Sequence, residues 1–273
     1  MLYLIATPIG NLSDITFRAI DTLKACHYIL CEDTRHTRPL LTHYEIQKPL
    51  KSFHKFNESF KENTIIEDLI AGLQIALVSD AGTPGISDPG AQLVARCVAE
   101  NIQVISIPGP CAAVAALSCS GLNTDLFQFY GFLPKKTSEL TKVLNTLLNY
   151  PGTTICYESP HRLLDVLEVL QELAPTRKLV VARELTKKFE EIQRGTAESL
   201  LNHWKQNPLK GEIVLMLEGY TETQELDWSE LTPGEHVMAI QETYKLSRMD
   251  AIKMVAKLRN VPKRSIYNET EKE

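Results

Sequence analysis

A Gly- and Pro-rich stretch between an apolar run and a helical pattern constrains the fold of this chain more than any other feature. It covers residues 79–90 and reads Ser-Asp-Ala-Gly-Thr-Pro-Gly-Ile-Ser-Asp-Pro-Gly. The apolar, β-leaning residues 75–78 precede it and the helical pattern 91–99 follows. Such connections usually span about 2–6 residues, and this longer stretch favours a functional loop over a plain turn. It predicts a ligand-carrying loop at the carboxyl edge of an open α/β sheet.

Strand-like and helical segments alternate through the first part of the chain, which is typical of a mostly parallel sheet with helices on its faces. The predicted strands are residues 2–6, 28–31, 50–53, 75–78 and 104–107. The predicted helices are a segment capped by Ser13 or Asp14 and ending near 25, followed by 37–43, 58–71 and the helix after Gly90.

A second α/β region begins near residue 126, where antiparallel pairings predict a mixed sheet. Its predicted strands are residues 127–130, 153–157, 178–182, 191–194 and 212–217, and its helices are 139–148, 163–173 and 197–205. We therefore expect two α/β domains, residues 1–121 with the ligand loops and residues 122–219 closing the cleft.

The last part of the chain changes character. Residues 220–231 contain acidic side chains and no Lys or Arg, which predicts a solvated linker. A helical extension, 232–273, follows with helices at 232–245, 249–259 and 263–270, the second of them capped by Ser247-x-x-Asp250. From Lys245 to Arg264 there are seven Lys or Arg and one acidic residue, although the chain as a whole carries a net charge of −5. This local polarity favours nucleic-acid binding, with a solvated basic helix face as the alternative.

Several site classes are excluded by the sequence. Neither Gly-x-Gly-x-x-Gly nor the phosphate loop Gly-x-x-x-x-Gly-Lys-Ser/Thr occurs. The six cysteines form no Cys-x-x-Cys pair and no His pair has zinc spacing, so we expect reduced thiols of a cytoplasmic protein and no metal site. Residues 104–124 are uncharged, but Pro108-Gly109-Pro110 interrupts them, so we expect no membrane span. No basic stretch precedes the first apolar run, so no signal peptide is expected.

Three Gly/Pro loops follow strands of the first region: residues 7–10, 80–90 and 108–110. The carboxyl ends of parallel strands share one sheet edge, so these loops are predicted to meet there. Their backbone groups can hold an uncharged or zwitterionic adenosine-like ligand.

Seven motifs then occur in one order, at residues 2–12, 32–37, 79–90, 107–110, 131–134, 157–162 and 182–188. In these motifs the chain resembles the ribosomal RNA small subunit methyltransferase I family, of the tetrapyrrole-methylase-like class that uses S-adenosylmethionine. The resemblance covers nearly the whole chain, including the C-terminal helices, which resemble a helix-turn-helix-like extension. One departure is Cys111, where the family pattern has Ser. A thiol is the weaker hydrogen-bonding group.

The resemblance implies 2′-O-methylation of a cytidine ribose in the decoding region of 16S rRNA by a cytoplasmic homodimer. It also implies that S-adenosylmethionine binds between the two α/β domains. By motif match, the cofactor residues are Pro8, Ile9, Thr83, Pro84, Ile86, Gly109, Pro110, Cys111, Tyr157, Leu185 and Ile213. Ordinary core packing is the alternative for Ile86, Leu185 and Ile213.

A ribose hydroxyl needs a proton acceptor, and a positioned carboxylate, His or Lys can provide one. The candidate catalytic residues are Asp33, Glu184 and Lys187, with Asp33 or Glu184 as the base. The candidate RNA-binding residues are Arg35, Arg162, Lys188, Lys253, Lys257, Lys263 and Arg264. A surface ion pair is the alternative for each charged candidate.

Two other functions fit parts of the sequence. A tetrapyrrole C-methyltransferase would share the cofactor loops, but the basic tail and the 32–35 motif argue against it. A DNA-binding regulator would use the tail in a major groove and the α/β part as a ligand sensor.

Overall fold

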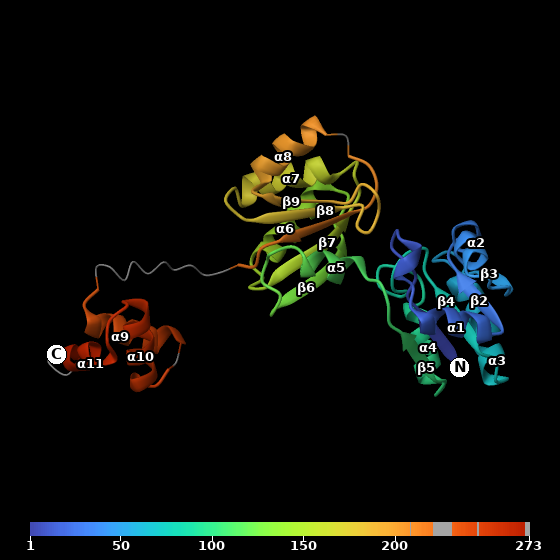
Figure 1. Ribbon diagram of the computed structural model, residues 1–273, viewed down its shortest axis with the longest axis horizontal. Coiled ribbons are helices and arrows are strands. Elements are labelled where there is room, and N and C mark those ends of the chain that lie inside the picture. The colour runs from blue at the N-terminus through green and yellow to red at the C-terminus, as the bar shows by residue number, and fades with distance from the viewer. Residues whose placement is uncertain (208, 221–230, 245, 271–273) are drawn as a thin grey trace. The chain divides into compact units, whose positions relative to one another are not determined.

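The computed structural model describes residues 1–207, 209–220, 231–244 and 246–270. The chain forms two compact units, Met1–Tyr220 and Thr221–Glu273 (Figure 1). The first unit contains two five-stranded sheets, and the second unit contains helices. The predicted linker 220–231 lies outside the described residues except for its two end residues.

The first sheet is parallel throughout, as the alternating pattern predicts. Its strand order is β3-β2-β4-β1-β5. These strands are β1 (Leu2–Ile5), β2 (Tyr28–Cys31), β3 (Leu50–Ser52), β4 (Ile75–Val78) and β5 (Val104–Ile107). The parallel arrangement brings every strand's carboxyl end to the same edge.

Helices cover both faces of this sheet. The helices α3 (Glu58–Ile70) and α4 (Ala91–Ala99) pack on one face through residues such as Ile65 and Leu93. The helices α1 (Phe17–Ala25) and α2 (Thr34–His43) pack on the other, where Leu23 and Leu41 meet the strands. Strands buried on both faces account for the continuous apolar runs in the sequence.

Two helix starts around the first sheet differ from the prediction. Residues Leu12–Asp14 form a short 3-10 turn, because the Asn11 side chain accepts the Ser13 N–H at 3.1 Å. Thr16, rather than Ser13 or Asp14, caps α1 by accepting the Ala19 N–H at 3.1 Å. The next helix, α2, begins three residues earlier than predicted, because the Asp33 carboxylate accepts the Arg35 N–H at 2.8 Å.

The second sheet is mixed, as predicted. Its order is β6-β7-β10-β8-β9, with one parallel pair (β6 with β7) and three antiparallel pairs. These strands are β6 (Phe127–Phe132), β7 (Thr153–Glu158), β8 (Leu179–Arg183), β9 (Glu191–Gly195) and β10 (Ile213–Leu217).

Three helices cover one face of the second sheet: α6 (Thr137–Leu148), α7 (Leu163–Leu173) and α8 (Ala197–Gln206) (Figure 1). The opposite face packs against α5 (Ala112–Ser118) and against Ile9 from the first loop. Although α5 precedes the predicted domain boundary at residue 121, its buried residues therefore belong to the core of the second sheet.

The second unit contains α9 (Pro233–Tyr244), α10 (Arg248–Leu258) and α11 (Lys263–Thr270). Ile240, Ile252 and Ile266 form its core. The predicted cap is present: Ser247 Oγ accepts the Asp250 N–H at 3.2 Å and donates to Asp250 Oδ2 at 2.7 Å.

The six cysteines carry free thiols; Cys26, Cys31, Cys97 and Cys156 are buried. In the described part of the chain, no helix combines the length and apolarity needed to cross a bilayer.

Gly90 closes the long loop before α4, with φ of +121° and its N–H donating to Glu58 Oε1 at 3.2 Å. A Cβ there would lie 2.5 Å from Leu77 Cδ2, whereas a Cβ on Gly72, also at positive φ, would meet nothing within 4 Å. We expect Gly72→Ala to lower the free energy of unfolding by about 1–2 kcal/mol, the cost of left-handed backbone. For Gly90→Ala we expect a further loss of about 1–3 kcal/mol of unfolding free energy, because the added Cβ would clash with Leu77.

Urea denaturation of both variants measures the difference. Equal losses in the two variants would show that the packing of the loop against β4 does not constrain Gly90.

Candidate functional site

Three loops of the first sheet meet at one edge, as predicted from the strand order. Thr7 and Gly82 form an isolated antiparallel bridge, with N–H to O distances of 2.9 and 3.0 Å. Thr83 Oγ1 donates to the Pro110 carbonyl at 3.3 Å, which joins the third loop to the second. These contacts fix the loops against one another through main-chain groups and the Thr83 hydroxyl.

A cavity of about 350 Å3 lies between this edge and the second sheet. Seven of the eleven predicted cofactor residues line it: Ile9, Thr83, Ile86, Cys111, Tyr157, Leu185 and Ile213. The other four, Pro8, Pro84, Gly109 and Pro110, belong to the same loops but do not line the cavity. The structure therefore brings seven members of the predicted set to one cavity and places the other four in the loops beside it.

Carboxylates are the feature of this cavity that sequence reasoning missed. Asp80, Asp88, Glu158 and Glu212 line it, and the described residues along its wall include no Lys, Arg or His. Asp80 and Asp88 lie inside the loop motif and Glu158 lies inside the 157–162 motif. The motifs therefore contained these carboxylates, although none of them was predicted as a site residue. An acidic wall favours a ligand that carries positive charge.

Glu158 is the most deeply buried of these carboxylates, with 3% of the residue exposed. Its Oε1 accepts the Ser159 N–H at 2.6 Å and lies 3.3 Å from Arg162 Nη1. Its Oε2 has no hydrogen-bond partner within the described parts of the chain. Burial raises the pKa of Glu158 against the opposing influence of these two groups. A buried, unpartnered acceptor at a cavity wall suits a donor on a bound ligand.

Asp88 is half-buried in the same wall. Burial, together with the charges of Glu32 and Asp80, raises the pKa of Asp88 to about 6. Lys55 and the Ser79 hydroxyl oppose this shift but do not cancel it.

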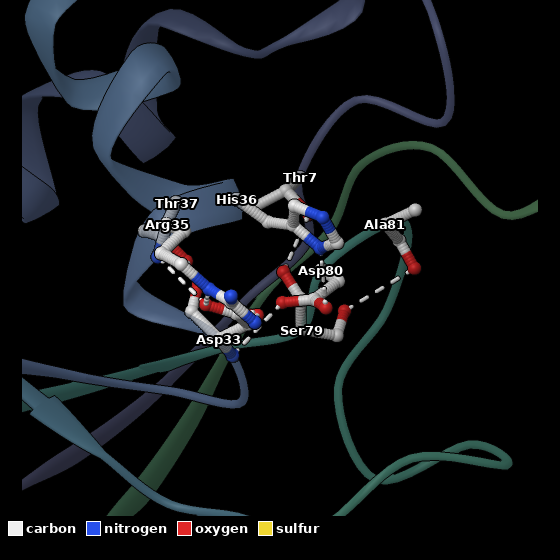
Figure 2. Close-up of polar contacts among 8 residues, drawn as sticks. All are labelled: Thr7, Asp33, Arg35, His36, Thr37, Ser79, Asp80 and Ala81. Carbon is white, nitrogen blue, oxygen red and sulfur yellow. Dashed lines mark hydrogen bonds and ion pairs between the residues drawn. The ribbon is translucent and has the colours of Figure 1, made fainter.

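The predicted catalytic residue Asp33 lies beside the cavity, in the cluster drawn in Figure 2. Its carboxylate accepts hydrogen bonds from the Arg35 guanidinium, the shortest at 2.6 Å from Nη2, and from the Arg35 N–H. These bonds lower the pKa of Asp33 to about 2. The Arg35 side chain as a whole is exposed to solvent.

The other two predicted catalytic residues form an ion-pair network. Lys187 Nζ lies 2.8 Å from Glu184 Oε1 and 2.9 Å from Glu212 Oε2. Burial raises the pKa of Glu184, but the bonds from Lys187 and the Glu212 N–H outweigh it and lower the pKa overall. The Lys187 stem also packs on the first loop, where a Cβ on Gly10 would lie 2.5 Å from its Cγ. This network holds the two sheets' loops together at the cavity edge.

The predicted RNA-binding residues fall in two places. In the first unit, the Arg162 guanidinium donates to the carbonyls of Leu133 and Pro134 at 3.1 and 2.6 Å, whereas Lys188 is exposed. In the second unit the exposed side chains are Lys253, Lys257, Lys263 and Arg264, of which Lys253 pairs with Asp250 at 2.8 Å.

A profile of the family described as Tetrapyrrole (Corrin/Porphyrin) Methylases matches residues 1–201. The chain is 47% identical over 270 residues to a protein of Halalkalibacterium halodurans named Ribosomal RNA small subunit methyltransferase I, covering 98% of this chain and 93% of that one. A protein of the same name from Bacillus subtilis is 45% identical over 273 residues, with 98% and 93% covered.

Solved structures share the fold at low identity. A uroporphyrin-III-C-methyltransferase from Thermus thermophilus matches with a TM-score of 0.58 and 19% identity, covering 80% of this chain and 93% of that one. A diphthine synthase matches with a TM-score of 0.62 and 13% identity, covering 81% and 90%.

The raised pKa of Asp88 predicts how stability depends on pH. The folded state binds the Asp88 proton more tightly than the unfolded state, so this contribution is present below about pH 4 and is lost as pH rises through about 6. We expect the unfolding free energy of the wild type, measured relative to Asp88→Asn, to fall by about 1–2 kcal/mol between pH 4 and 7, after allowance for solvent screening.

Urea unfolding at four pH values provides the comparison, with the exposed Asp125→Asn as the matched control. A constant difference between the wild type and Asp88→Asn would contradict a raised pKa.

Proposed function

Because this chain belongs to the tetrapyrrole (corrin/porphyrin) methylase family, we propose that it transfers a methyl group from S-adenosylmethionine to the ribose 2′-hydroxyl of a cytidine in the decoding region of 16S rRNA. The chain is a methyltransferase by its family and its fold. The choice of acceptor rests on sequence identity: the chain is 40–48% identical to relatives whose names specify ribosomal RNA of the small subunit.

The cavity supports S-adenosylmethionine as the donor. Its volume of about 350 Å3 falls within the range of small-molecule sites, about 300–1,000 Å3. Apolar side chains such as Ile9, Leu185 and Ile213 suit a purine ring, and the carboxylates suit the sulfonium and ammonium charges. The orphan Glu158 Oε2 is a fitting acceptor for an ammonium or a ribose hydroxyl of the donor.

When bound, S-adenosylmethionine supplies a methyl group already activated by the sulfonium. The chain must therefore align the acceptor oxygen, about 3–3.5 Å from the methyl carbon, and accept its proton. The roles of Asp33, Glu184 and Lys187 in this step stay predictions. Their hydrogen bonds and the lowered pKa of Asp33 and Glu184 favour positioning of the loops over proton uptake at neutral pH.

Basic side chains outside the cavity support RNA as the acceptor. Arg35 and Lys188 are exposed in the first unit, and the second unit presents further Lys and Arg side chains on α10 and α11. Phosphate contacts of this kind set docking register, whereas the ribose is selected inside the cavity. We propose that Arg162 acts mainly through the β6 loop that it holds, and that the enzyme is a cytoplasmic homodimer.

The two rival functions share parts of this description. A tetrapyrrole C-methyltransferase would use the same donor cavity, but similarity below 25% to such enzymes supports the fold alone. A ligand-sensing DNA regulator would explain the basic helices but not the full-length identity to named methyltransferases.

A methyl-transfer assay separates these functions. We expect tritium from methyl-labelled S-adenosylmethionine to appear in 16S rRNA when the enzyme acts on small-subunit particles that lack the modification. Nuclease digestion should recover the label in a 2′-O-methylated cytidine. Label in a porphyrinoid, or operator binding without label, would instead support one of the rivals.

The second unit provides a separate test of RNA binding. The test variant replaces four basic residues by Gln: Lys253, Lys257, Lys263 and Arg264. Each lost contact to single-stranded RNA reduces the slope of log affinity against log salt by about 0.7, so we expect a reduction of roughly 3 for four contacts. The matched control replaces four exposed lysines of the first unit: Lys24, Lys142, Lys178 and Lys205.

Filter binding of rRNA over a salt series measures both slopes. An equal change in the two variants would mean that the second unit has no specific part in RNA binding.

A further inference from the structure

An imidazole-carboxylate pair stands at the edge of the donor cavity. His36 Nδ1 lies 3.0 Å from Asp80 Oδ2, and the other oxygen, Asp80 Oδ1, accepts the Asp33 N–H at 3.2 Å (Figure 2). Asp80 itself lines the cavity. The pair therefore links the cavity wall to the first turn of α2, where His36 is the third residue.

The residue that precedes Asp80 is held by the loop pairing described above. Thr7 Oγ1 donates to the Ser79 carbonyl at 3.2 Å, and Ser79 Oγ donates to the Gly82 carbonyl at 3.0 Å. Ser79 is 3% exposed, so the residue before Asp80 is anchored in the buried end of β4. A fixed carboxylate restricts the orientation of the imidazole that it binds.

The pair also sets the protonation of the ring. With Nδ1–H donated to Asp80, the neutral imidazole keeps its lone pair on Nε2. The His36 side chain is 70% exposed, so the ring is accessible to a large substrate docked over the cavity. Figure 2 shows the ring lying over Asp80, with its second nitrogen directed away from that carboxylate.

The charges around the ring determine its pKa. The hydrogen bond and charge of Asp80 raise the pKa of His36, and the charge of Asp33 adds to this. Desolvation of the ring and the charge of Arg35 oppose this shift only in part. A raised pKa makes the neutral imidazole a stronger proton acceptor.

The neighbouring carboxylates are weaker candidates for proton uptake. Asp33 is held by Arg35 and its pKa is about 2, so it is a poor acceptor at neutral pH. Glu184 is held by Lys187 at 2.8 Å. In the cavity wall, the rival carboxyl groups with raised pKa are Asp88, with a pKa of about 6, and the buried Glu158.

We propose that His36 is the general base of the reaction and that Asp80 positions it. This inference rests on the proposed function, since it needs a ribose hydroxyl as acceptor. The hydroxyl O–H bond breaks and its proton moves to His36 Nε2. The oxygen forms a bond to the methyl carbon as the C–S bond breaks, and the electron pair of that bond stays on sulfur, which leaves a neutral thioether.

Single-turnover methyl transfer to small-subunit particles tests this assignment. We expect His36→Gln to slow transfer by about 10²–10⁴-fold. Binding of S-adenosylmethionine, measured by calorimetry, should stay unchanged, because His36 does not line the cavity. His43→Gln, an exposed histidine at the other end of α2, is the matched control and should keep the wild-type rate.

Two readouts distinguish a base from a structural residue. We expect the rate of His36→Ala to recover on addition of imidazole, since the vacated site is open to solvent. In Asp80→Asn, loss of the carboxylate lowers the pKa of His36, so the rise of rate with pH should move to lower pH, with a lower plateau. Asp88→Asn should leave that rise in place.

The outcomes separate the two proposals. A labelled wild type together with a His36→Gln rate within twofold of it would overturn the role of His36 and leave the proposed function intact. If the rise of rate with pH is lost in Asp88→Asn alone, the base is Asp88, and the role of His36 is overturned as well. A wild type that labels no RNA would overturn the proposed function, and this inference with it.

Discussion

The antiparallel pairing of Thr7 with Gly82 holds the loops after β1 and β4 against each other at the carboxyl edge of the first sheet. This pairing uses main-chain groups, and Gly82 adopts a φ of +82° to make it. The third loop joins through Thr83 and the Pro110 carbonyl. The cavity wall, the position of Asp80 and, through Asp80, the orientation of His36 all follow from these bonds. A change in the pairing would therefore move donor site and proposed base together.

The site has to accommodate a cationic donor and a polyanionic acceptor, and its charges are distributed accordingly. The donor carries a sulfonium, which the acidic wall of Asp80, Asp88 and Glu158 favours, but the proposed acceptor is a polyanion that such a wall repels. Exposed cations such as Arg35 and Lys188 lie outside the wall, where phosphates would dock. Under the proposed function, a single ribose would approach the carboxylates while the rest of the RNA stays on basic surface, so docking and chemistry would depend on different side chains.

Local patterns in the sequence were sufficient for most elements, because period and punctuation are local properties. The strands 75–78 and 104–107 and the helix 163–173 have the predicted bounds. The start of α1 was wrong, since Asn11 and Thr16 compete with Ser13 as caps and only the three-dimensional turn decides between them. The acidic wall was missed for a different reason. Antiparallel pairing of β10 with β7 sets Ile213 opposite Glu158, which brings Glu212 and Glu158 to one cavity, and strand order is not a local property.

Backbone strain is concentrated around the same cavity. Ser87 lines it with a φ of +63°, and Glu184 and Thr186, at +52° and +67°, flank the cavity residue Leu185. Each such residue costs about 1–3 kcal/mol and persists only where its surroundings hold it. The Glu184–Lys187–Glu212 network and the bond from the Thr186 N–H to Glu190 Oε2 at 2.5 Å provide that support. Lys187 therefore supports the backbone on both sides of the cavity residue Leu185, in addition to its ion pairs.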